Sequence, residues 1–351
     1  MLSLNFKGKN LNIVKKYWIF VIVSAVIILA GLVDMLFIRH MNFGVEFSGG
    51  IGVEITAENT NIDVKAEAKK WFEGGNADKT GYVIDGVPGT SGTILKTTNF
   101  RLKSELKDGT NLDVTINGDS ETLLVQHSTT IKEELTEYLK DVATKAGDSQ
   151  AEIGVETHVI GGDVKNHTVT SAVIAVSVAV VVILAYIAIR FNLLAGVSAV
   201  IALLHDVLIM FSLTTLFQIP VNMTFIAAVI TIIGYSINAT IVVFDRVREL
   251  NVLPSYLDKT DAEIAEDSIM GTMSRSILTT LTTLVMIVCL AIFGNASIRE
   301  FAVPIIFGLI AGLYSSILLS ASTWVRLRKL FKQENKKPTK KIKRVKEQAK
   351  A

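Results

Sequence analysis

His205 and Asp206 are adjacent proton-binding residues that lie halfway along an apolar run of the chain, residues 193–217. An ionisable side chain at mid-bilayer costs about 2.5–3.5 kcal/mol on insertion scales, so each one calls for an explanation. The run contains no Lys or Arg that could neutralise Asp206. Its carboxylate must therefore face the bundle interior, a water-filled cavity or a partner chain. The alternatives are a hydrogen-bonded packing pair and a functional or assembly role, and we favour the second.

A second polar pattern crosses the apolar run 223–244. Thr231, Gly234 with Tyr235, and Asn238 recur at helical spacing and share one face. Because this face is small and polar, it is expected to meet other helices rather than lipid. Gly234 permits close backbone approach, and Asn238 can hydrogen-bond across an interface. The charged residues that follow the run are interpreted as a solvated helix end: Asp245, Arg246, Arg248 and Glu249.

Two later apolar runs carry further polar side chains. Arg275 precedes the run 276–293, where it either snorkels to the interface or supplies the positive partner of an intramembrane carboxylate. The last run contains Gly308, Gly312, Ser316 and Ser320 at strict four-residue spacing. Such a stripe of small residues predicts close packing against another span or another subunit.

These residues are held by a chain with the composition of a membrane protein. Half of its 351 residues are hydrophobic and its mean hydropathy is +0.45, which is too apolar for an ordinary soluble protein. Six apolar stretches each approach the roughly 20 residues that cross a bilayer. We therefore predict a polytopic α-helical membrane protein with spans at 17–38, 168–189, 193–217, 223–244, 276–293 and 301–324.

The Lys and Arg residues near the membrane ends predict the orientation. Basic residues in the segment 1–16, Arg190, and the basic tail 325–351 place both termini in the cytoplasm. The charged segment 245–275 is then expected to be a cytoplasmic loop. Residues 39–167 must lie on the other side of the membrane.

The segment 39–167 is long enough for a folded domain of ordinary size. Its pattern predicts a small α+β domain, with a helix around 62–72 and a second helix that starts at a capping box of Thr130 and Glu133. The expected strands are 52–56, 112–116, 122–126 and 152–160. No catalytic motif or ligand-spaced cluster is found, so neither a metal site, a cofactor nor an enzyme activity is predicted.

Five motifs follow one another along the chain. They are Gly44-Val45-Glu46-Phe47-Ser48-Gly49-Gly50, Tyr186-Ile187-Ala188-Ile189-Arg190-Phe191, His205-Asp206-Val207, Gly234-Tyr235-Ser236-Ile237-Asn238 and Thr240-Ile241-Val242-Val243-Phe244-Asp245-Arg246-Val247-Arg248-Glu249. The first includes the glycines of a turn after the first span, Gly44, Gly49 and Gly50. Together these motifs resemble one family, the SecF proteins of the SecD/SecF type. The resemblance covers the membrane part almost completely, with matching order and spacing, and is weaker in the outer domain.

The resemblance implies an architecture and a function. The fold would be half of a bundle of the resistance-nodulation-division (RND) type, with a ferredoxin-like outer domain, in the bacterial cytoplasmic membrane. The function would be use of the proton-motive force, together with SecD, to draw secreted polypeptides outward late in export. Implied partners are SecD, the SecYEG translocon with YajC- or YidC-type accessory proteins, an unfolded secretory polypeptide and membrane lipid, with no nucleic acid. The alternative is half of an RND-type exporter of small molecules or lipids.

One position departs from the family pattern. Family members usually have Asn-Asp-Thr in the fourth span, where the Asp is regarded as part of the proton route, and this chain has Asn238-Ala239-Thr240. Three explanations stay open: a substitution in an otherwise typical protein, a natural variant that relies on Asp206 or on SecD carboxylates, and a subunit without proton coupling. Our candidates for the proton route are His205, Asp206, Asn238, Ala239, Thr240 and Arg275.

Overall fold

The structure of the chain is a computed structural model. It describes residues 11–48, 50–58, 62, 64–73, 82–86, 98–102, 119–148, 151–160, 162–294 and 296–331.

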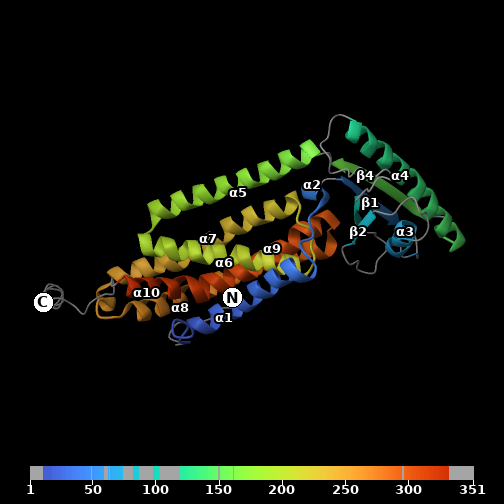
Figure 1. The fold of residues 1–351 in the computed structure, drawn as a ribbon. Coiled ribbons are helices and arrows are strands. Elements are labelled where there is room, and N and C mark those ends of the chain that lie inside the picture. The colour runs from blue at the N-terminus through green and yellow to red at the C-terminus, as the bar shows by residue number, and fades with distance from the viewer. Residues whose placement is uncertain are drawn as a thin grey trace, which may run out of the picture.

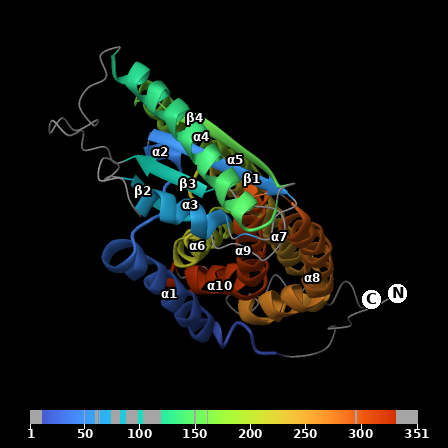
Figure 2. The same cartoon turned by 90° about the vertical axis from the view of Figure 1, so that its right-hand side faces the viewer.

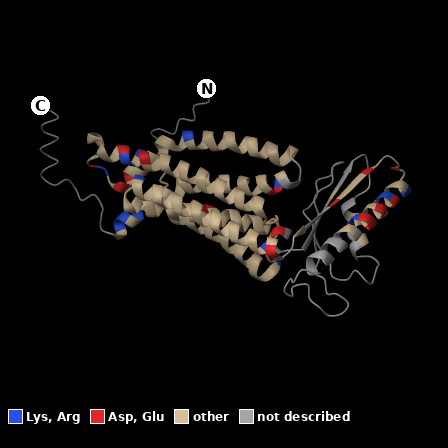
Figure 3. Cartoon of the chain, turned by 90° about the horizontal axis from the view of Figure 1, so that it is seen from above, with Lys and Arg blue, Asp and Glu red and all other residues tan. Residues whose placement is uncertain are grey.

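An elongated helical bundle carries a small α+β domain at one end (Figure 1). Within the described part of the chain, six helices are long and apolar enough to cross a membrane. We call the end of the bundle that carries the α+β domain the domain end, and the opposite end the far end. Charged residues gather at these two ends and in the α+β domain, whereas the long middle of the bundle is almost free of them (Figure 3). This distribution is the one that a hydrocarbon surrounding requires.

All six predicted spans are helical, and several extend beyond their predicted limits. The helices are α1 (Tyr17–Val33, continued by the π-helical segment Asp34–Ile38), α5 (Gly162–Arg190), α6 (Leu193–Leu216), α7 (Met223–Val252), α8 (Asp261–Phe293), and α9 (Ala296–Tyr314), which runs through the π-helical segment Ser315–Ser320 into α10 (Ala321–Leu330).

The predicted loop 245–275 is wrong as a loop, because α7 and α8 occupy most of it. Only 253–260 connects the two helices, and it includes the 3-10 turn Pro254–Tyr256. Helix α8 begins at a capping box in which the side chain of Thr260 accepts from the Glu263 amide and the Glu263 carboxylate accepts from the Thr260 amide. Hydropathy marks where a chain enters hydrocarbon, and a helix with polar outer turns continues past that point.

Helix α9 lies at the centre of the bundle and α5 at its edge. Two views place α1 and α5 on opposite sides of α9 (Figures 1 and 2). In the most apolar part of the span that contains α9, 61% of the residues are buried, whereas the corresponding value for α5 is 11%. Most of the α5 surface is therefore uncovered within this chain.

The α+β domain has the element order β-α-β-β-α-β. Its four strands form one antiparallel sheet in the order β2-β3-β1-β4, with Gly50 opposite Ile160 and Glu58 opposite Glu152 in the central pair. The elements are β1 (Gly50–Glu58), α3 (Val64–Glu73), β2 (Tyr82–Gly86), β3 (Thr98–Leu102), α4 (Asp119–Lys145) and β4 (Glu152–Ile160). The short helix α2 (Val45–Ser48) joins α1 to β1.

The predicted elements of this domain are partly confirmed. The helix at 62–72 and the strands at 52–56 and 152–160 correspond to α3, β1 and β4. The predicted strand at 122–126 is wrong, because these residues belong to α4, and the capping box at Thr130 therefore does not start a helix. A short apolar run cannot be assigned to a strand or a helix by periodicity alone. The predicted strand 112–116 lies outside the described residues, as do Gly49 and most of the basic tail.

The core of the domain lies between the sheet and its helices. Leu135 and Leu139 of α4 are fully buried against Ile55 of β1 and Val155 of β4. Strand β4 ends at Ile160 and α5 begins at Gly162, so the sheet continues almost directly into a membrane helix.

Candidate functional site

The Asp206 carboxylate is completely buried in the middle of the bundle. Its Oδ2 accepts hydrogen bonds from the Ser236 hydroxyl of α7 and from the Ser315 hydroxyl, the latter at 2.8 Å. Its Oδ1 lies 2.9 Å from Nδ1 of His205. Three polar groups from three segments thus converge on one carboxyl group, as a buried charge requires. The predicted packing pair of His205 and Asp206 is present, but it is only part of a larger cluster.

His205 extends the cluster towards α1. Its Nε2 lies 2.7 Å from the Ser24 hydroxyl, which also donates to the Phe20 carbonyl at 3.1 Å. The imidazole ring stacks on the ring of Tyr314 at 5.9 Å between centroids and 15° between planes. The Tyr314 hydroxyl donates to the same Phe20 carbonyl at 2.7 Å. A continuous chain of hydrogen-bonding groups therefore runs from Asp206 through His205 to Ser24.

This arrangement can hold and relay a proton. A carboxyl group and an imidazole in contact can pass a proton between them, because each group can bind and release one. The hydroxyls of Ser24, Ser236 and Ser315 can each rotate to donate or accept. We refer to Ser24, His205, Asp206, Ser236 and Ser315 as the carboxylate cluster.

Close helix packing holds the carboxylate cluster together. A Cβ atom at Gly308 would lie 2.5 Å from Cγ1 of Ile232, and one at Gly312 would lie 3.3 Å from Cβ of Ser236. The predicted stripe of Gly308, Gly312 and Ser316 therefore lies where α9 and the following segment approach other helices closely, with Ser316 fully buried. The absence of side chains at the two glycines lets α7 bring Ser236 within reach of Asp206.

The other predicted residues of α7 point away from the carboxylate cluster. Thr231, Gly234 and Asn238 are exposed in this single chain, and we call these three residues the open polar face. A Cβ atom at Gly234 would meet nothing within 4 Å, so within this chain Gly234 does not provide the predicted close approach. Tyr235 is half-buried, and its hydroxyl donates to Thr280 of α8 at 3.3 Å.

The structure does not unite all the candidates for a proton route. Ala239 is half-buried and Thr240 is buried, one turn beyond the cluster residue Ser236. Arg275 on α8 is exposed. Among the described residues, the recorded ion pairs include none between Arg275 and Asp206. Within this chain the Asp206 carboxyl group is held by contacts with His205, Ser236 and Ser315, whereas the Arg275 side chain is directed to the surface.

The predicted glycine turn lies beside the start of α7 at the domain end. The Gly44 amide donates to the Val221 carbonyl at 2.8 Å, and a Cβ atom at Gly44 would lie 2.9 Å from Cβ of Asn222. Glu46 accepts from the Met223 amide at 2.6 Å. A carboxylate at this position satisfies a free amide and complements the helix dipole. Gly50 is the first residue of β1, so the motif ties α7 to the entrance of the α+β domain.

The predicted charged motif at the far end is only partly a solvated helix end. Asp245 pairs with Arg190 of α5 at 2.7 Å, and Arg246 pairs with Glu249 at 2.7 Å, while Arg248 is exposed. The Asp245–Arg190 pair connects α7 to α5. Both of its side chains are more than a third exposed, so the expected contribution to stability is about 1 kcal/mol or less.

Comparison with known proteins identifies the family. Residues 139–330, more than half of the chain, match the family described as "Protein export membrane protein SecD/SecF, C-terminal". The chain belongs to the SecD/SecF family. Within it, the chain is similar to SecF of Alicyclobacillus acidocaldarius, with 44% identity over 47% of this chain and 54% of that one. It is also similar to SecF of Acidaminococcus fermentans, with 30% identity over 93% of this chain and all of the relative.

Longer relatives align with the chain over part of their length. SecDF of Bacillus subtilis is 32% identical over 89% of this chain and 37% of its own length. The crystal structure of SecDF from Thermus thermophilus, titled a translocon-associated membrane protein, superposes with a TM-score of 0.66 at 25% identity and covers 94% of this chain and 40% of that one. The SecF-type chain therefore corresponds to less than half of a SecDF protein.

Four members of the site were missed by sequence reasoning: Ser24, Ser236, Tyr314 and Ser315. Ser236 lies inside the quoted family motif, and Ser315 directly precedes the predicted stripe residue Ser316. Serine is common in packed membrane helices, so its type alone does not mark a site. Among the residues that the structure describes, no three His, Cys, Asp or Glu side chains gather as they would to hold a metal ion.

Proposed function

We propose that this SecF-family chain is an accessory subunit of the bacterial Sec protein-export machinery that uses the proton-motive force together with a SecD partner. The observation that carries the proposal is the pairing of a buried proton-binding cluster with a polar face that the chain leaves uncovered at membrane depth. An exporter half of the same architecture is less well supported, because the relatives named above are protein translocase subunits.

The open polar face supports a protein partner within the membrane. The Asn238 amide is exposed in the single chain, and an amide facing hydrocarbon without a hydrogen-bond partner is costly. Small and polar residues are the types by which membrane helices associate. Because this chain corresponds to only 37% of the Bacillus subtilis SecDF protein, the remaining length of such a protein would supply a covering half. We propose that a SecD protein provides it here.

The carboxylate cluster would carry the proton. His205 and Asp206 would exchange this proton with the interface between the chain and SecD. The candidate residues towards this interface are Asn238, Ala239, Thr240 and Arg275. One elementary charge that crosses 100 mV releases about 2.3 kcal/mol, which is enough to bias a two-state equilibrium about fiftyfold. Since Ala239 cannot bind a proton, the route depends on Asp206 and on carboxylates of the partner.

The outer domain would convert this bias into movement of the emerging polypeptide. We infer a ferredoxin-like domain from its β-α-β-β-α-β order and its sheet order β2-β3-β1-β4. From the positive charges near the membrane ends we infer that this domain lies outside the cytoplasm, with both termini inside. Because β4 continues almost directly into α5, a tilt of that helix would move the sheet.

Co-purification from native membranes tests the proposal. A tagged chain should recover SecD and SecYEG, together with YajC- or YidC-type proteins, rather than an outer-membrane channel. Gly234→Leu should reduce SecD recovery, because the new side chain fills the open polar face. Val178→Leu is the matched control, since Val178 is an exposed residue on the lipid side of α5. Recovery of an outer-membrane channel without SecD would overturn the proposed function.

A further inference from the structure

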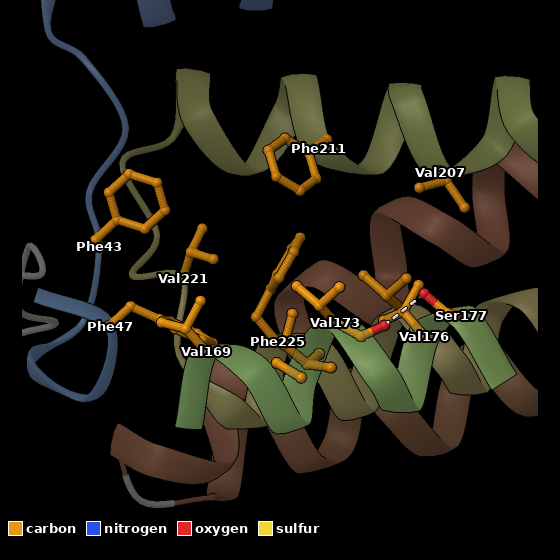
Figure 4. Close-up of a pocket in the computed structure, with 13 residues that line it drawn as sticks. Phe43, Phe47, Val169, Val173, Val176, Ser177, Val207, Phe211, Val221 and Phe225 are labelled. Atoms are coloured by element: carbon orange, nitrogen blue, oxygen red, sulfur yellow. Dashed lines mark hydrogen bonds between the residues drawn. The ribbon is translucent and has the colours of Figure 1, made fainter. Parts of the chain in front are cut away.

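A second site in the membrane bundle has chemistry unlike that of the carboxylate cluster. A pocket of about 430 Å³ lies between α5, α6 and α7 at the domain end of the bundle. Figure 4 shows the side chains that line it. Its walls are almost entirely hydrocarbon, with Phe211 of α6 and Phe225 of α7 facing a row of short side chains on α5. We propose that this pocket, the α5 slot, binds one acyl chain of a membrane phospholipid.

Short side chains on α5 create the slot. Val169, Ala172, Val173 and Val176 occupy the α5 side at helical spacing, and none is large enough to reach the opposite wall. The rings of Phe211 and Phe225 meet edge to face, with centroids 5.4 Å apart and planes at 78°, which gives the far wall a fixed shape. A close-packed helix pair would leave no void of this size.

The lining offers nothing to a polar ligand. Ser177 is the polar residue among the side chains that line the slot. Its hydroxyl already donates to the Val173 carbonyl of its own helix at 2.7 Å. A water molecule is retained in a cavity only where two to four polar partners meet it. The expected occupant is therefore apolar.

The dimensions match an extended hydrocarbon chain. Residues 169–177 span about 12 Å along α5, at 1.5 Å per residue, which is the outer part of a hydrocarbon core about 30 Å thick. A volume of about 430 Å³ is large enough for a stretch of hydrocarbon chain. An unbranched acyl chain can enter it parallel to the helices.

The slot opens to the bilayer and not to the proposed protein partner. Val173, which lines it, is 61% exposed on an apolar helix that the rest of the chain leaves largely uncovered. At about 100° per residue, the α7 residues of the slot, Phe225, Ile226 and Val229, lie on the side of α7 opposite to the open polar face. A protein that covers Gly234 and Asn238 therefore leaves the slot to lipid, whose chains are the main component at this depth.

Photochemical labelling in nanodiscs tests the assignment on the full chain. The probe is a phospholipid with a mid-chain diazirine, diluted into a phosphatidylethanolamine and phosphatidylglycerol bilayer, and adducts are mapped by mass spectrometry. We expect adducts on Phe211 and Ile226, which face the slot, in addition to those on Val178 and Val182, which face the surrounding lipid. Val176→Phe should lower the Phe211 and Ile226 adducts at least fivefold, and Val178→Phe should change them less than twofold.

Three results would overturn the assignment. The first is wild-type protein labelled at Val178 and Val182 but not at Phe211 or Ile226. The second is slot labelling that persists in folded Val176→Phe protein. The third is loss of slot labelling when SecD is added, which would make a partner helix the occupant. The wild-type comparison decides the matter even if Val176→Phe does not fold, and none of these results depends on the proposed role in export.

Discussion

The Ser315 hydroxyl donates a hydrogen bond to the buried Asp206 carboxylate across 2.8 Å, from the first residue of a π-helical segment. Segments of this kind inside α-helices frequently occur at functional sites, because they change the helical register locally. Here the segment follows the central helix α9 and places its serine beside a proton-binding group. A change in the protonation of Asp206 would alter this contact, and with it the packing between α6 and the last span.

Asp206→Asn should abolish the proton-dependent part of export while leaving the protein folded. Asparagine has nearly the same shape and can still accept the Ser236 and Ser315 hydrogen bonds, but it does not bind a proton. The measurement is secretion of a reporter in cells that rely on this chain, with and without a collapsed proton gradient. Asp206→Asn cells in which secretion still responds to the gradient would exclude Asp206 from the route.

Ser315→Ala should destabilise the bundle by about 1.5–3 kcal/mol, because it removes a hydrogen bond to a buried carboxylate. Thr170→Ala is the matched control, since the Thr170 hydroxyl donates to the Asn166 carbonyl of its own helix and is exposed. The free energy of unfolding in mixed micelles compares the two variants. Equal stabilities would mean that Ser315 does not support the carboxylate.

Gly308→Ala and Gly234→Ala should have opposite effects on the isolated chain. A Cβ atom at Gly308 would overlap Ile232, and such overpacking costs about 1–3 kcal/mol. A Cβ atom at Gly234 meets nothing, so the alanine should stabilise the isolated helix by up to about 1 kcal/mol. Thermal unfolding of the two variants checks the prediction, and Gly308→Ala should cost less in an Ile232→Ala background than in the wild-type chain. Similar losses at both glycines would contradict the packing described for α7.

Ala239→Asp should raise proton-dependent export. The position is half-buried on α7, one turn from Ser236, and the aspartate would restore a proton-binding group to the pattern that the family usually carries. Ala239→Asn is the control, because it adds a polar side chain of the same size without a titratable group. Export measured across a range of imposed pH gradients should rise for the aspartate alone, and an unchanged gradient dependence would refute the prediction.

The membrane architecture was predictable because hydrocarbon imposes a strong and local rule on sequence. Each apolar run of span length became a helix, and the starts at Tyr17, Leu193 and Met223 coincide with the prediction. Helix ends were less predictable, because α7 and α8 continue through polar turns that hydropathy excludes. In the α+β domain, the predicted strand at 122–126 is part of α4 in the structure. The error arises because a short apolar run has no period that distinguishes a strand from a helix.

The ionisable residues of the candidate site could be predicted from the sequence, whereas its serine residues could not. His205 and Asp206 are conspicuous within an apolar run, since each is costly there. Ser24, Ser236 and Ser315 become meaningful only when three separate spans meet, which depends on helix rotation and on the π-helical segment. The four-residue spacing of small residues predicts that Ser316 lies at a packing interface, whereas the hydroxyl that donates to Asp206 belongs to Ser315. The sequence predicts the open polar face as a packing face, and the SecD protein that we propose to cover it is a separate chain.

Proton flux in proteoliposomes is the most direct test of the central claim, that the buried cluster works only when another protein covers the open polar face. Purified chain is reconstituted alone and with SecD, and flux is recorded with a trapped pH indicator under an imposed gradient. We expect flux only when both proteins are present, and loss of that flux in Asp206→Asn. Equal flux from the chain alone would contradict it.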